Sequence, residues 1–136
     1  MDFKKLYSKL NPEAFLRVGF GAMYLYSSID IIRHPANWEW AVKTLPGFIQ
    51  TPIVNVMGLN GFLFWHGVGE LVLALVFLSW FLPRIFLRFA AFFAFLEMAS
   101  ILVFIGIDLI TFRDIGLLGG MAALLVMSFR QVDLQV

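Results

Sequence analysis

The sequence has no cysteine among its 136 residues. Disulfide exchange, thiolate catalysis, cysteine-ligated zinc and iron–sulfur clusters all require a thiol, so this chain can carry none of them. The absence also excludes the small four-helix membrane enzymes that pass electrons from thiols to quinone through pairs of cysteines. Histidine is scarce as well, with two residues in the chain.

Charged residues are also few. They make up 14% of the chain, which has a net charge of +1, whereas about 25% is usual in soluble domains. A nucleic-acid-binding protein needs a basic patch to neutralise phosphates, so we expect no nucleic-acid partner. Apolar residues instead make up 61% of the chain, including 16 Phe and 4 Trp. A soluble domain of this size cannot bury that many apolar side chains, and we therefore expect an integral membrane protein whose main partner is the lipid bilayer.

The apolar stretches are long enough for four membrane spans, since one span needs roughly 20 residues. We predict a single transmembrane domain over residues 1–136, with an all-α fold and four helices in one antiparallel bundle. Residues 53–82 would form a helix of about 45 Å, which is too long for one upright span. Polar and glycine residues near Gly58 predict a break before Gly61. The predicted spans cover about residues 14–32, 61–82, 85–107 and 115–129.

A short amphipathic helix is predicted between the first two spans, over residues 36–50. Prolines interrupt the hydrophobicity there, and Trp38, Val42, Leu45 and Ile49 recur at helical spacing. Tryptophan is typical of the membrane–water boundary. We therefore expect this segment to lie on the membrane surface.

The distribution of positive charge predicts the orientation. With four spans, the N-terminus, the turn after the second span and the C-terminus share one side. That side holds Lys4, Lys5, Lys9, Arg17, Arg84, Arg88 and Arg130, and the other side holds Arg33, Lys43 and Arg113. The positive-inside rule then places both termini in the cytoplasm.

Two glutamates lie near the centres of predicted spans, Glu70 in the second and Glu97 in the third. A central charge costs at least about 2.5–3.5 kcal/mol on insertion scales, so such residues are candidates for function. Both glutamates share a helix face with small residues, which mark helix–helix contacts in membranes. We expect both carboxyl groups to face packed neighbours at similar depth, with at least one of them protonated at neutral pH.

Three further residues extend this midplane group. His66 lies one turn from Glu70 on the same face, and Arg17 and Tyr24 line one face of the first span. The group can be a ligand or proton site, a metal site, or a polar core in which Arg17 and Tyr24 only satisfy the glutamates. A di-iron site needs a second His and more acids than this chain offers, so of these three we do not expect the metal.

A second polar group is expected at the outer ends of the spans. Its residues are Asp30, Arg33, Asp108, Arg113 and Asp114. Opposite charges can pair there to fasten the loops, and Asp114 can cap the fourth span. The alternative is the mouth of a cavity between the spans, roofed by the Trp38–Trp40 segment.

A glycine step opens the last span, where Gly116 and Gly120 form a GxxxG pattern. Such a pattern lets another backbone approach closely. The approaching helix can belong to this chain or to another subunit, and the sequence is compatible with either.

The order of these motifs resembles the DoxX family of small four-span membrane proteins. Three segments carry the resemblance: FLRVGFGAMYLYSS with Arg17 in the first span, GVGELVLALVFL with Glu70 in the second, and RDIGLLGG at the start of the last. The resemblance implies a bacterial or archaeal inner-membrane protein. Some members of the family are linked to a thiosulfate:quinone oxidoreductase or to membrane oxidoreductase complexes.

Three functions follow as hypotheses. The first is a membrane subunit of a quinone-linked oxidoreductase system, with a pocket formed by Glu70, Glu97 and His66 for a quinone-like or lipid-derived ligand. The second is a non-catalytic scaffold that anchors or stabilises a partner protein. The third is a proton-coupled carrier of small solutes. A homo-oligomer, or a partner membrane or peripheral oxidoreductase subunit, fits each of them.

Overall fold

A computed structural model describes residues 11–108 and 111–130 of the chain. These residues form helices and connecting turns, with no strand among them. In chain order the helices are α2 (Pro12–Arg33), η1 (Pro35–Trp38), α3 (Glu39–Lys43), α4 (Gly47–Met57), α5 (Leu59–Leu78), α6 (Arg84–Phe104), η2 (Thr111–Arg113) and α7 (Asp114–Phe129). The predicted all-α class is thus confirmed for the described residues.

Four of the helical segments are long and apolar enough to cross a membrane: Pro12–Arg33, Leu59–Leu78, Arg84–Phe104 and Thr111–Phe129. Each overlaps one predicted span. Their outer faces carry large apolar side chains, such as Phe15, Trp65, Phe93 and Val103, all more than half exposed. Lipid tails can cover such a surface at no hydrophobic cost. The chain is a multi-pass membrane protein.

Local sequence signals determine several helix ends. Asn11 caps α2 by accepting a hydrogen bond from the backbone N–H of Glu13 (3.0 Å), with Pro12 in the first turn. Gly58, at φ +69°, separates α4 from α5 and confirms the predicted break before Gly61. The second span ends at Leu78 rather than at residue 82, because Ser79 is extended (φ −92°, ψ 105°) and cannot continue the helix.

The prediction of one amphipathic helix over residues 36–50 was wrong. This region contains η1, α3 and the first part of α4, and α4 runs on to Met57. The reason is Pro46, whose extended backbone (ψ 140°) separates α3 from α4 and whose nitrogen cannot donate a helical hydrogen bond.

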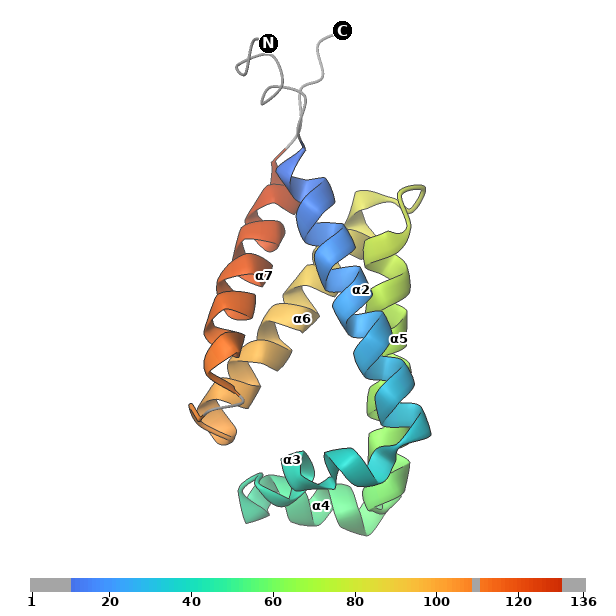
Figure 1. The fold of residues 1–136 in the computed structure, drawn as a ribbon, viewed down its shortest axis with the longest axis vertical. Helices are drawn as coiled ribbons and strands as arrows, with labels where there is room; N and C mark the ends of the chain where they lie inside the picture. The colour runs from blue at the N-terminus through green and yellow to red at the C-terminus, as the bar shows by residue number, and fades with distance from the viewer. Residues whose placement is uncertain (1–10, 109–110, 131–136) are drawn as a thin grey trace, which may run out of the picture.

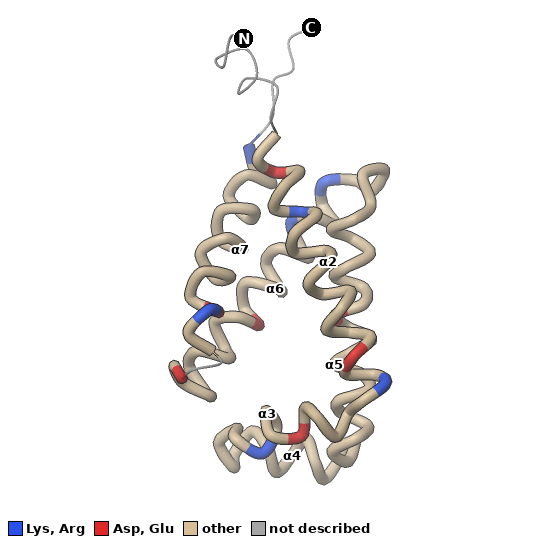
Figure 2. Tube along the Cα trace, viewed as in Figure 1, with Lys and Arg blue, Asp and Glu red and all other residues tan. Residues whose placement is uncertain are grey.

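The spans associate as two pairs. α2 packs along α5, and α6 packs along α7. Figure 1 shows the pairs close together near the start of α2 and the end of α7, and further apart at the opposite end, where α3 and α4 lie. The start of α2 and the end of α7 therefore lie at the same end of the molecule. Several lysines or arginines gather at the end where α2 begins and α7 ends, and the others lie singly along the rest of the structure (Figure 2).

Small residues bring the helices together, as the sequence predicted. Gly67 and Ala74 are buried on α5, on the same face as Glu70, and Ala90 and Ala94 are buried on α6. Part of the GxxxG step packs against another helix of this chain. A Cβ on Gly120 would lie 2.6 Å from Cζ of Phe20 on α2, whereas Gly116 and Gly119 have nothing within 4 Å of that position. Gly120 thus serves contact within this chain, and the face around Gly116 remains open.

Gly67→Ala is expected to lower the free energy of unfolding by about 1–3 kcal/mol, the usual cost of overpacking. The new Cβ would lie 2.8 Å from Cγ1 of Ile32 and 3.3 Å from the carbonyl oxygen of Ser28, so α2 and α5 must move apart. The matched control is Gly69→Ala, since Gly69 has open space at that position. Unfolding of the two variants in the same detergent checks the prediction, which equal stability would contradict.

Candidate functional site

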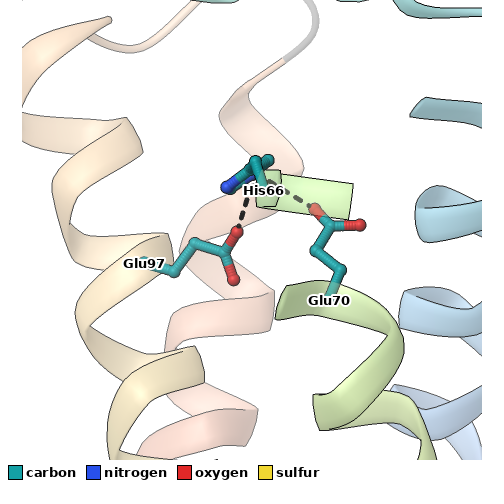
Figure 3. A group of neighbouring side chains, drawn as sticks. All are labelled: His66, Glu70 and Glu97. Carbon is teal, nitrogen blue, oxygen red and sulfur yellow. Dashed lines mark ion pairs between the residues drawn. The ribbon is translucent and has the colours of Figure 1, made fainter. Parts of the chain in front are cut away.

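Three ionisable side chains meet between α5 and α6. His66 Nε2 lies 3.4 Å from Glu70 Oε1 and 3.3 Å from Glu97 Oε1. One nitrogen and two carboxylate oxygens, one from each residue, all lie within 4.8 Å of one another. Figure 3 shows the two carboxylates on either side of the imidazole, one from each helix. The sequence placed Glu70 and Glu97 at similar depth, and the structure brings them into one group with His66.

The three side chains differ in exposure. The side chain of Glu70 is 8% exposed, that of Glu97 16% and that of His66 36%. Glu70 Oε2 is buried and has no hydrogen-bond partner among the described residues. A buried carboxylate oxygen without a partner is costly, and native structures contain few of them. The group is thus accessible from the His66 side and incompletely satisfied on the Glu70 side.

Neighbouring aromatic residues hold two of the three side chains in place. The hydroxyl of Tyr24 on α2 donates a hydrogen bond to Glu97 Oε2 (2.8 Å), and Tyr24 is 1% exposed. Phe62, one turn before His66, stacks on the imidazole with ring centroids 5.8 Å apart. Three spans therefore contribute to the site, and Tyr24 occupies the place that the sequence predicted.

The chemistry open to this group follows from its donors. Two ionised carboxylates at this separation repel each other unless a proton or a cation lies between them. Neutral imidazole offers one donor and one acceptor nitrogen, and the imidazolium offers two donors. The site can therefore hold a proton, donate a hydrogen bond to a ligand oxygen, or bind a cation.

Arg17 does not belong to this site, contrary to the expectation that it would satisfy the glutamates. Its guanidinium donates to the carbonyl oxygens of Phe77 (3.0 Å) and Ser79 (2.6 Å), lies 3.7 Å from Glu13 Oε1 and sits over the ring of Trp80. α5 ends at Leu78, and the guanidinium supplies hydrogen bonds that the last carbonyls of a helix lack. Its role here is to hold α2 against the end of α5.

The five outer residues do not form one cluster. Asp30 and Arg33 lie at the end of α2, whereas Asp108, Arg113 and Asp114 lie around η2 and the start of α7, well away from that end (Figure 1). The two groups belong to different helix pairs, and the pairs are spread apart at this end. The five residues thus form two groups rather than one, and the cavity mouth stays a prediction.

Each outer group has its own contacts. Asp30 accepts hydrogen bonds from the ring nitrogens of His34 (3.0 Å) and Trp38 (2.7 Å), so it fastens η1 to α2. Asp108 accepts a hydrogen bond from the backbone N–H of Thr111 (2.8 Å). Asp114 is the first residue of α7 and makes no capping hydrogen bond, because Arg113 occupies the cap position. Its carboxylate still lies where a helix N-terminus favours an anion.

Sequence reasoning missed Glu13 and Phe62. Glu13 is buried (7% exposed) and lies 3.6 Å from Arg84 as well as near Arg17. The four-residue spacing of Glu13 and Arg17, and of Phe62 and His66, was the available signal, because residues so spaced are neighbours on a helix surface.

Comparison of the chain with protein-family models, with curated proteins and with solved structures found no match.

Proposed function

We propose that this chain is a DoxX-like protein of the cell inner membrane, with its four spans forming one bundle. In this arrangement η1, α3 and α4 lie along the outer membrane surface. The exposed aromatic residues Trp40 and Phe48 support that placement. The opposite end, with Arg84, Arg88 and Arg130, would face the cytoplasm according to the positive-inside rule.

We further propose that the protein is a membrane subunit of a quinone-linked oxidoreductase system, and that the site binds a quinone-like or lipid-derived molecule. The observation that carries this proposal is the meeting of His66, Glu70 and Glu97 between spanning helices, with an unsatisfied carboxylate oxygen. Ionisable residues are expensive inside a membrane and mark ligand or proton sites by default.

Proton handling is the role that suits these side chains. Reduction of a quinone to a quinol takes up two electrons and two protons. The electrons would come from an electron-donating partner subunit. His66 and Glu97 would supply protons at the quinone oxygens, and the accessible His66 side would admit the head group. The Tyr24 hydroxyl, bonded to Glu97, would keep that carboxyl group oriented.

A nearby apolar groove suits a hydrophobic tail. It has a volume of about 330 Å³ and lies on α2 and α7, lined by Phe15, Leu16, Gly19, Phe20, Met23 and Leu117. Phe20 precedes Tyr24 by one turn, so both lie on one face of α2. An isoprenoid or acyl chain in this groove would place its head group towards Tyr24.

Glu97→Gln is expected to weaken binding of decylubiquinone by about 10–100-fold, the range for losing a hydrogen bond to a charged group. The substitution keeps the shape of the side chain and the Tyr24 contact. Titration of the quinone into protein in lipid nanodiscs, followed by tryptophan fluorescence, measures the affinity. The control is Glu39→Gln, which removes a glutamate paired with Lys43 (2.6 Å) on α3. Equal affinity of Glu97→Gln and Glu39→Gln would contradict the proposal.

A scaffold is the second candidate function. It is favoured by the open face around Gly116 and Gly119, where another helix can approach closely. That helix would come from a second copy of the chain or from a partner subunit. In this case Glu97→Gln would alter thermal stability or partner capture and leave quinone affinity unchanged.

A further inference from the structure

The distances around His66 fit a metal site better than they fit hydrogen bonds. Charge-assisted N–H···O bonds usually measure about 2.7–2.9 Å. Two ligands at zinc distances of about 2.0–2.2 Å, at a tetrahedral angle, lie about 3.3–3.5 Å apart. His66 Nε2 lies 3.3 Å and 3.4 Å from the two carboxylates. These two distances therefore match two of the ligand–ligand distances of a tetrahedral zinc site.

Burial gives an independent argument for a cation. Glu70 is 7% exposed, and its Oε1 faces His66 Nε2 at 3.4 Å (Figure 3). Nothing in the described part of the chain places a lysine or arginine beside either glutamate, since the ion pairs of both involve His66. A divalent cation with two carboxylates and a neutral imidazole gives a site of zero net charge. Zero charge suits the interior of a membrane, where a net charge is expensive.

The surroundings also resemble those of bound metals. Metal ligands are usually held by hydrogen bonds from an outer shell of residues. Here the Tyr24 hydroxyl donates to Glu97 Oε2 (2.8 Å), which leaves Oε1 directed at His66. Phe62 stacks on the imidazole in a nearly parallel orientation (15°). Both ligand side chains are thus oriented before any cation arrives.

We infer that His66 Nε2 and one carboxylate oxygen each of Glu70 and Glu97 bind a divalent transition-metal cation, with Zn²⁺ as the best fit. The sequence argued against a metal because it contains no second His–Glu motif, and it could not show that Glu97 completes the set from another helix. Three protein ligands leave the fourth position open for an oxygen of water or of a bound ligand. The inference rests on the proposed ligand site being functional. It replaces proton supply by His66 and Glu97, because donor atoms that hold a cation carry no proton, and it leaves the open position for a ligand oxygen.

The test uses the full chain, purified without a histidine tag, stripped with a chelator and reconstituted in nanodiscs. Zn²⁺ is titrated, and bound metal per chain is measured by mass spectrometry of the metal after gel filtration. We expect one Zn²⁺ per chain. Affinity should fall at least about 100-fold in His66→Gln and in Glu97→Gln, each of which removes a ligand, and about 10–100-fold in Tyr24→Phe, which removes an outer-shell contact.

The control is His34→Gln. His34 and Asp30 have the same four-residue spacing and a 3.0 Å contact. His34 is exposed, Asp30 is partly buried, and the pair belongs to no three-donor group among the described residues. Co²⁺ is a second probe, because its visible absorption reports the coordination geometry independently of protein stability.

Tetrahedral Co²⁺ absorption that disappears in Glu97→Gln and persists in His34→Gln would support the site. The inferred metal site would be contradicted if the protein bound no metal, or if Glu97→Gln and His34→Gln bound it equally well. If decylubiquinone binding stayed sensitive to Glu97→Gln in the chelated protein, the proposed function would survive that failure. If Glu97→Gln changed neither metal binding nor decylubiquinone binding, both the metal site and the proposed function would be contradicted.

Discussion

Glu70→Met should make the metal-free protein more stable, by about 1–3 kcal/mol, the cost usually assigned to a buried polar group without a partner. Glu70 is 7% exposed and its Oε2 has no hydrogen-bond partner within the described residues. Methionine has a similar length and no polar atom to desolvate. His66 would keep Glu97 at 3.3 Å. Thermal and denaturant unfolding in detergent with a chelator present measure the change in stability. In a separate titration without chelator, the same variant should no longer bind Zn²⁺.

The sign of this change separates a functional site from a structural polar core. Residues kept for function often cost stability, so removing one stabilises the fold while activity is lost. If Glu70 instead holds α5 against its neighbours, Glu70→Met would destabilise the protein. Glu39→Met is the matched control, because Glu39 also pairs with a basic residue four positions away but lies in α3 with its side chain 30% exposed. Its stability should change by no more than about 0.5 kcal/mol.

The sequence predicted the spans well because its signals there are strong and local. A run of apolar residues identifies a membrane helix by length alone, and Gly58 identified a break. The ends that depend on distant residues were less predictable. α5 ends at Leu78, where Arg17 of α2 donates hydrogen bonds to the carbonyl oxygens of Phe77 and Ser79. Arg17 lies 60 residues before Phe77, and no local pattern predicts that contact.

The sequence predicted the depth and facing of the site and most of its residues, but it wrongly included Arg17. Small residues near Glu70 and Glu97 showed which helix faces are packed, since that is a property of each helix separately. Which helices become neighbours depends on the whole fold. Tyr24 and Arg17 both line α2, and only Tyr24 reaches Glu97, because Arg17 lies about two turns nearer the end of α5. The same limit explains why Asp30 and Asp114 were wrongly grouped.

Arg17→Ala is expected to lower the free energy of unfolding by about 3 kcal/mol, near the lower end of the cost of breaking a buried ion pair. The substitution removes hydrogen bonds to the carbonyls of Phe77 and Ser79 and the contact with Glu13, and Arg17 is 7% exposed. Arg84 remains 3.6 Å from Glu13 and limits the loss. Because the contact joins α2 to the end of α5, the two helices should separate first at that end. Hydrogen exchange of the last turn of α5 measures this opening directly.

Two further variants test the physical reason for the Arg17 effect. Arg17→Lys keeps the charge near Glu13, but an ammonium cannot reach both carbonyls with the planar fork of a guanidinium, so it should recover less than half of the lost stability. Arg33→Ala removes an exposed arginine at the other end of the same helix and should change stability by no more than about 0.5 kcal/mol. Equal stability of Arg17→Ala and Arg33→Ala would mean that the α2–α5 pair is held by apolar packing alone. Full rescue by Arg17→Lys would assign the effect to charge rather than to the carbonyl hydrogen bonds.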